Sequence, residues 1–261
     1  MGEAKRKKAG AVGSTADPSF QKSVFTQAFD QTCELLDDPD TEDLRAMITT
    51  FRGRNALLDR AATTYAVSGK AECRIGCSSC CHQMVLCTPF EVFSVARYLL
   101  KKKTAAEIAQ IKERLIALSH LPLDPAARQD AQHPCALLEN DRCTIYEHRP
   151  SVCRTALSAS RTACENCLAA KTGTVPFLLD AAAIAAVLQL AIDHAVITRR
   201  NLSTEKVELS RALLTALDDF EGTLTRWTNC EDPFQGAQVH FSGYPTNREM
   251  AKAAAKRFGI T

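Results

Sequence analysis

Apolar residues recur at helical spacing in the first part of the chain. From Pro18 they fall near one face of a helix, at Phe20, Val24, Phe25, Phe29, Leu35 and Leu36. Asp40 or Thr41 can cap a second helix, whose apolar positions are Leu44, Met47, Ile48, Phe51, Leu57 and Leu58. The pattern therefore predicts N-terminal helices over residues 18–70.

Two capping boxes predict a helical hairpin in the middle of the chain. The first, Thr88-Pro-Phe-Glu91, has proline at the first helical position and predicts a helix to about residue 102. The second, Thr104-Ala-Ala-Glu107, predicts a helix to about residue 118. We expect a tight turn between these helices to return Cys81 and Cys135 to the same end of the molecule.

Helical signals continue to the C-terminus. Apolar periodicity predicts helices over about 176–196 and 205–220. A third capping box, Thr246-Asn-Arg-Glu249, predicts a last helix that runs to Arg257 and stops at Gly259. Alternating strand patterns are few and there is no internal repeat. The fold class that we predict is mainly α, a helical domain stapled by an irregular cysteine-rich, metal-binding segment.

The chain divides into four predicted regions. Residues 133–170 are turn-rich and have no long apolar period, so core burial alone orders them poorly and a metal would supply folding energy. The predicted regions are a disordered basic tail over 1–17, N-terminal helices over 18–70, a cysteine-cluster metal-binding domain over 71–170 and a C-terminal helical region over 171–261.

Composition and the N-terminal sequence narrow the class of protein. A net charge of +2 and 6% aromatic residues do not favour nucleic-acid binding. The basic start is not followed by the apolar run of a signal peptide, which predicts a cytoplasmic protein with reduced thiols. The apolar stretch 175–196 includes Asp180, Gln189, Asp193 and His194, so we expect a buried helix and no membrane partner.

The chemistry of the chain lies in its cysteines, of which there are 12. In a reducing compartment, dense thiols favour metal ligation over disulfides. Spacing marks as candidate metal ligands Cys73, Cys77, Cys80 and Cys81 in a first group and Cys135, Cys143 and Cys153 in a second, which Cys164 or Cys167 could complete. If residues 73–81 are partly helical, the first four share one face. Adjacent cysteines rarely point at one tetrahedral centre, so Cys80 and Cys81 can serve different metals.

Charge and ligand type restrict the metal. Thiolate ligands select zinc or an iron–sulfur cluster, and spacing alone does not decide between these two. Arginines are placed to offset thiolate charge, above all Arg149 and Arg154, which flank Cys153. His82 and His148 lie beside the cysteines, where a hydrogen-bonding or surface role is more typical than ligation.

The strings Cys-x3-Cys-x2-Cys-Cys, Pro-Cys-x7-Cys and Ile145-Tyr-Glu-His-Arg-Pro-Ser-Val-Cys153-Arg154 resemble the YkgJ-type cysteine-cluster family. The resemblance covers roughly residues 70–170 and implies a zinc- or iron-chelating domain. It implies eight ligand cysteines, which are Cys73, Cys77, Cys80, Cys81, Cys135, Cys143, Cys153 and one of Cys164 or Cys167. This chain differs from the family pattern in having three residues between Cys73 and Cys77, and in adding Cys87.

Two other functions are alternatives to simple metal binding. Related cysteine clusters, of the [4Fe-4S] type, occur in flagellin lysine methylases, so a cluster-dependent protein lysine methyltransferase is one alternative. Glycine-rich nucleotide loops are missing from residues 1–70 and 171–261, which weighs against an enzyme. The second alternative is a thiol-redox protein that uses Cys164-Glu-Asn-Cys167, although the residues before this motif do not resemble a strand.

Overall fold

The fold is known from a computed structural model, which describes residues 17–37, 69–74, 76–124, 127–128, 133–170, 173–239, 241 and 243–260. Over these residues the protein is mainly α, as predicted. The helices are α1 (Pro18–Asp37), α3 (Pro89–Lys102), α4 (Ala105–Ser119), α6 (Ser151–Thr155), α7 (Arg161–Ala170), α8 (Leu179–Arg200), α9 (Leu209–Asp218), α10 (Phe220–Thr228) and α11 (Asn247–Phe258), with short 3-10 turns η2 (Ser79–His82), η3 (Tyr146–His148) and η4 (Gln235–Ala237). The predicted basic tail over 1–17, except Asp17, and the predicted second helix after Thr41 lie outside the described residues.

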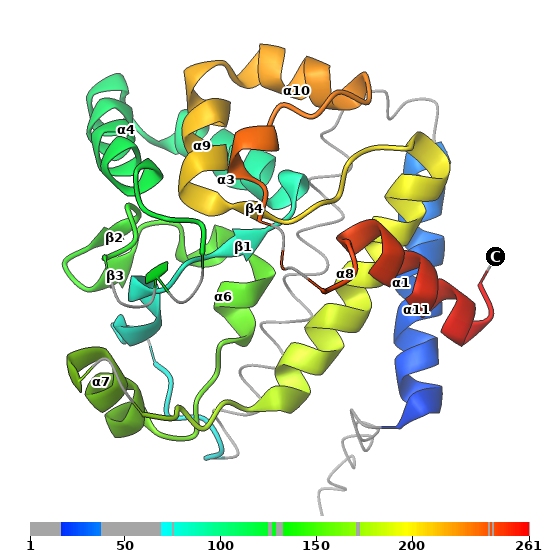
Figure 1. Ribbon diagram of the computed structural model, residues 1–261, viewed down its shortest axis with the longest axis horizontal. Coiled ribbons are helices and arrows are strands. Elements are labelled where there is room, and N and C mark those ends of the chain that lie inside the picture. The colour runs from blue at the N-terminus through cyan, green and yellow to red at the C-terminus, as the bar shows by residue number, and fades with distance from the viewer. Residues whose placement is uncertain are drawn as a thin grey trace, which may run out of the picture.

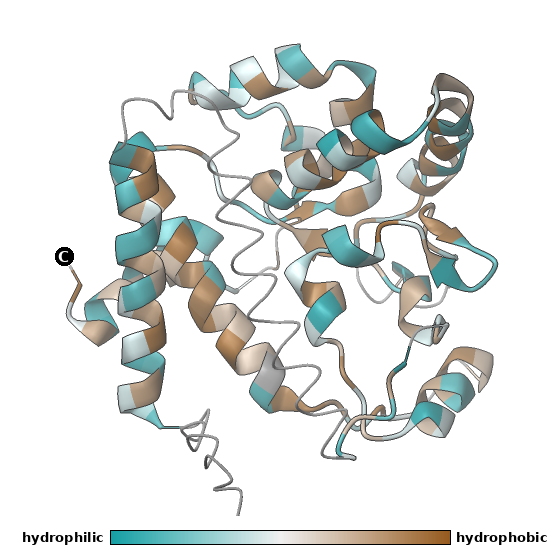
Figure 2. Ribbon diagram, turned by 180° about the vertical axis from the view of Figure 1, so that it is seen from behind, coloured by the Kyte–Doolittle hydropathy of each residue, from teal (hydrophilic) through white to brown (hydrophobic). Residues whose placement is uncertain are grey.

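One layer of the molecule consists of α1, α8 and α11 (Figure 1). The rings of Phe25 and Phe258 meet with centroids 5.1 Å apart, and Ala191 of α8 is fully buried beside them. Small alanines let the helices approach closely, and hydrophilic residues recur along α1 in the view from behind (Figure 2). The segment Ala182–Arg200 of α8 is long and apolar enough to cross a membrane, yet 56% of it is buried inside the protein, as in a core helix.

The main core is formed by α3, α4, α9 and α10. At its centre Trp227 is completely buried, and its ring lies 4.8 Å from that of Phe90 and 5.5 Å from that of Phe93. The indole N–H donates a hydrogen bond of 2.9 Å to the carbonyl of Ser203, so the buried polar atom is satisfied. Helices from the C-terminal part of the chain thus complete the core around α3 and α4.

Two short antiparallel ladders connect the helices to the cysteine segments. In one, β1 (Leu86–Cys87) pairs with β4 (Val207–Glu208). In the other, β2 (Leu138–Glu139) pairs with β3 (Arg142–Cys143). The first ladder fixes the chain after η2 to the helical core, and the second is tied to α4 by Arg114, which pairs with Glu139 at 2.8 Å.

The predicted helix starts are confirmed at all three capping boxes, because α3, α4 and α11 begin directly after Thr88, Thr104 and Thr246. The helix predicted over 205–220 is wrong in part. The chain there forms β4, α9 and the start of α10, and Asp219 divides the two helices because its carboxylate accepts a hydrogen bond from the N–H of Gly222. If the two helices were continuous, Asp219 would lie inside a helix and could not act as the N-cap of α10.

Candidate metal centre

The first cysteine group is mostly not helical, so the helical face considered for residues 73–81 is wrong. Only η2, which carries Cys80 and Cys81, has helical backbone. Gly76 has φ of +86°, and the N–H of Cys77 bonds to the carbonyl of Arg74 at 3.0 Å, so a turn precedes η2. Cys73 lies before this turn and approaches the cluster from a different direction.

The second cysteine group lies beside η2, as predicted, although α3 and α4 do not pair as a hairpin and pack instead on α9. The N–H of Cys135 donates a hydrogen bond of 2.7 Å to the carbonyl of Cys81. Asn140 and Asp141 both have positive φ, as a two-residue turn between paired strands requires, and this turn places Cys143 opposite Leu138.

The helix that carries Cys153 is fixed by a buried carboxylate. Glu91 is 4% exposed, and its Oε2 accepts the N–H of Thr88 at 3.0 Å in the capping box of α3. Its Oε1 accepts both the N–H and the hydroxyl of Ser151, at 2.8 and 2.7 Å. One carboxylate therefore holds the starts of α3 and α6 together, two residues before Cys153. The Thr88–Glu91 box signalled a helix start in the sequence, but nothing there signalled the link to Ser151.

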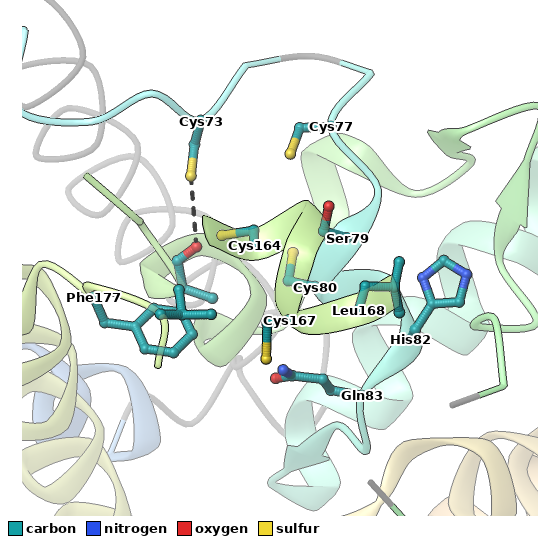
Figure 3. Close-up of a pocket in the computed structure, with 12 residues that line it drawn as sticks. Cys73, Cys77, Ser79, Cys80, His82, Gln83, Cys164, Cys167, Leu168 and Phe177 are labelled. Atoms are coloured by element: carbon teal, nitrogen blue, oxygen red, sulfur yellow. Dashed lines mark hydrogen bonds between the residues drawn. The ribbon is translucent and has the colours of Figure 1, made fainter. Parts of the chain in front are cut away.

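The thiols line two adjoining cavities (Figure 3 shows the smaller one). The larger cavity has a volume of about 220 Å³ and is lined by Cys77, Cys80, Cys81, Cys135, Cys143 and Cys153. The smaller cavity has a volume of about 40 Å³ and is lined by Cys73, Cys77, Cys80, Cys164 and Cys167. Each of the nine predicted ligands lines at least one of them, and Cys77 and Cys80 line both.

The sulfur atoms do not converge on one point in this arrangement. Within the described residues, no group of three or more histidine, cysteine, aspartate or glutamate side chains has the geometry to hold a metal ion. Side-chain rotation can bring the sulfur atoms closer together, because a change of χ1 between staggered rotamers moves a cysteine sulfur by about 3 Å. The donor set itself, soft thiols from several segments around two cavities, is of the type that zinc and iron–sulfur centres use.

Electrostatics distinguish Cys80 from its neighbours. The thiol of Cys81 donates a hydrogen bond to Cys80, which lowers the pKa of Cys80 to about 7 and raises the pKa of Cys81. Burial raises the pKa of Cys135 to about 11 and places the pKa of Cys153 well above its usual range. Most of these thiols are therefore neutral at pH 7 without a metal, and a bound cation would ionise them.

Arg142 and Arg149 line the larger cavity and supply positive charge there, whereas Arg154, which was predicted together with Arg149, does not line it. Arg149 lines the cavity, and its charge favours the thiolate forms of Cys80 and Cys143. Its guanidinium lies 3.7 Å from the centre of the Tyr146 ring. Arg154 is 2% exposed, and its guanidinium donates to the carbonyls of Glu147 and Arg149. Arg154 thus fixes the loop that presents Arg149.

Three cysteines and two nearby histidines are not among the predicted metal ligands. Cys33 and Cys87 are buried in the apolar core, and Cys230 is exposed; none of the three lines either cavity. His148 stacks on Tyr98 with ring centroids 4.0 Å apart. His82 lines the smaller cavity, but its Nδ1 lies 3.2 Å from the carbonyl of Ser78, which fits a hydrogen-bonding role.

The arrangement defines a helical protein with a multi-thiol chelating segment. Residues 72–172 match the model of the CxxCxxCC family, described as "Putative zinc- or iron-chelating domain", which confirms the resemblance seen in the sequence. No curated protein and no solved structure gave a match to the chain. The family description supports chelation of zinc or iron and goes no further.

Proposed function

We propose that the protein is a metal-binding protein whose larger cavity holds iron as an iron–sulfur cluster of the [4Fe-4S] type. The ligands would be Cys81, Cys135, Cys143 and Cys153, with Cys80 as the neighbouring thiol. The observation that carries this proposal is the cavity of about 220 Å³ among these sulfurs. Four thiolates at about 2.3 Å close around a single zinc ion, whereas a cluster of several atoms needs such a space.

The walls of the cavity suit this centre. Apolar side chains of Val85, Leu137, Ile145 and Leu209 line it beside the sulfurs. They keep the dielectric low, which strengthens the attraction between Arg149 and the thiolates. A cluster bound here would supply one-electron transfer, and burial, hydrogen bonds and nearby charge would set its reduction potential.

The thiol-redox alternative has less support from the geometry. Cys164 and Cys167 lie within α7, which begins at Arg161, whereas a redox Cys-x-x-Cys opens a helix directly after a strand. A methyltransferase activity would require a substrate site next to the cluster, and we do not propose one.

The test is to purify the whole protein without oxygen, record its absorption from about 300 to 700 nm and count metals per chain by mass spectrometry. A broad band near 400 nm with about four irons per chain is the expected result. A colourless protein with zinc alone would reject the cluster and leave zinc chelation, and a protein without either metal would reject the proposed function.

Variants identify which thiols hold the metal. Cys153→Ser should lose the iron and much of the soluble protein, because metal and fold are coupled. Cys77→Ser should also reduce the metal content, because the thiol of Cys77 lines both cavities. Cys33→Ser is the matched control, since this thiol is buried away from both cavities. Equal metal content in all three variants would contradict the assignment.

A further inference from the structure

The helix α7 has an unusual attachment to the rest of the protein. None of its ten residues is buried, and its neighbour in the fold is η2. The Arg161 N–H donates to the Glu72 carboxylate at 2.7 Å, while the Arg161 side chain pairs with Glu165 inside the same helix. An isolated helix of this length is marginal in water, so apolar burial does not explain why α7 holds its place.

The helix α7 places two thiols against the rest of the protein. Cys164 and Cys167 are three residues apart and therefore share one face of the helix. Both line the smaller cavity, together with Cys77 from the turn before η2 and Cys73, which lies just before that turn (Figure 3). Two cysteine pairs from two separate segments are the usual construction of a closed four-thiolate site.

The smaller cavity has the size and surroundings of a site for one ion. Its volume of about 40 Å³ is a few times the roughly 10–15 Å³ that a single water needs. The N–H of Ser158 donates a hydrogen bond of 3.2 Å to the sulfur of Cys73, as backbone amides do toward ligating thiolates. Leu168, Val175 and Phe177 supply apolar walls.

We propose that Cys73, Cys77, Cys164 and Cys167 form a second, separate site for a single zinc-type divalent ion, which fastens α7 to the turn before η2. This inference rests on the proposed function, because both centres use thiols of the cysteine-rich segment. It differs in assigning zinc to the second site and giving that ion a structural role. Both Cys164 and Cys167 are then ligands, where the family resemblance implies only one of them. Cys80 lies between the two centres, since it lines both cavities.

The test compares metal content in the whole protein and in a Cys164→Ser/Cys167→Ser variant, with Cys230→Ser as the control for loss of an exposed thiol. The wild type should contain one zinc in addition to the metal of the larger cavity. The double variant should lose that zinc and keep the iron and the absorption near 400 nm. Glutamyl endopeptidase should then cut after Glu165 at least tenfold faster, because this exposed residue lies on the released helix.

Each other outcome has a distinct meaning. Unchanged metal content and unchanged cleavage in the double variant would overturn the second site. Loss of all metal from the double variant would also overturn it, because the nine thiols would then form one shared centre. A wild type that contains iron but no zinc would reject the second site and leave the proposed function intact. A wild type with zinc but no iron would reject the iron–sulfur cluster alone.

Discussion

Glu91 illustrates how a single residue can set the position of a candidate metal ligand. Its carboxylate accepts hydrogen bonds from Thr88 and Ser151, and these donors belong to the starts of two different helices. The carboxylate is buried, so water cannot replace a lost bond. The position of Cys153 therefore depends on a residue 62 positions earlier in the chain.

Substitution of Glu91 by glutamine should destabilise the fold and weaken metal binding together. The glutamine amide would turn an NH2 group toward donors that need an acceptor, and a buried unsatisfied donor costs about 1–3 kcal/mol. Urea denaturation of Glu91→Gln should show a loss in this range, with less iron per chain. Glu113→Gln, at an exposed position on α4, is the control. Unchanged stability and metal content in Glu91→Gln would contradict the positioning role.

His194 makes the stability of the helical layer depend on pH. Both ring nitrogens lack a hydrogen-bond partner within the described residues, and the ring stacks on Phe29 with centroids 5.4 Å apart. Burial, with a smaller effect from Lys252, lowers the pKa of His194 below 6.5. Because the folded state favours neutral histidine, this contribution to stability is present above pH 6.5 and is lost as the pH falls through the folded-state pKa.

Replacement of His194 by phenylalanine should remove this pH dependence. The phenyl ring keeps the stacking on Phe29 but cannot accept a proton. The free energy of unfolding, measured by urea denaturation from pH 5 to pH 8, should fall less steeply toward acid in His194→Phe than in the wild type. Parallel curves for the two proteins would show that His194 does not titrate on unfolding.

At the scale of elements, the capping boxes determine where helices begin. At the start of α11, the hydroxyl of Thr246 accepts a hydrogen bond from the N–H of Glu249, and Gly259 ends the helix with φ of +74°. Since α11 packs on α1 and α8, a frayed start would loosen the whole layer.

Loss of the cap at Thr246 should therefore be measurable in the full chain. Thr246→Ala removes the acceptor and should cost about 1 kcal/mol of stability. Thr246→Ser keeps the hydroxyl and should differ little from the wild type. Thermal denaturation followed by circular dichroism compares the two. An alanine variant as stable as the serine variant would mean that the cap contributes nothing at this position.

Local signals explain which parts of the fold could be predicted. The starts of α3, α4 and α11 depend on hydrogen bonds between residues three apart, so the sequence contains them. The Asp219 cap of α10 is equally local, since its hydrogen bond to Gly222 also spans three residues, and it was missed because the apolar spacing continues through it. The pairing of β1 with β4 joins segments far apart in the chain and could not be predicted from spacing. The nine cysteines could be identified from their spacing as candidate ligands, whereas their distribution over two cavities depends on where α7 docks.

At the scale of the whole molecule, the segment that matches the chelating family is not packed on its own. Phe90 and Phe93 of α3 lie inside this segment, but Trp227, which covers them, lies outside it. Leu209, from the same C-terminal part, lines the larger cavity beside the thiols. The cysteine-lined larger cavity and the C-terminal helices therefore share one core.

Removal of the Trp227 side chain should accordingly affect the distant metal. Trp227→Ala leaves a large cavity between α3 and α10 and should cost about 3–5 kcal/mol. We expect lower metal content in this variant as well as a lower midpoint of urea unfolding. Trp227→Phe, which keeps most of the ring contacts, should retain the metal. A Trp227→Ala variant that is stable and contains as much metal as the wild type would indicate that metal binding is independent of this core.

The late position of Trp227 in the chain also has a consequence for synthesis. At roughly 5–20 residues per second, the helix that carries Trp227 leaves the ribosome several seconds after Cys153. During that interval the thiols are already synthesised, while the core that holds their segments in place is incomplete. A metal ion that binds in this interval therefore meets thiols that are not yet held at their final positions.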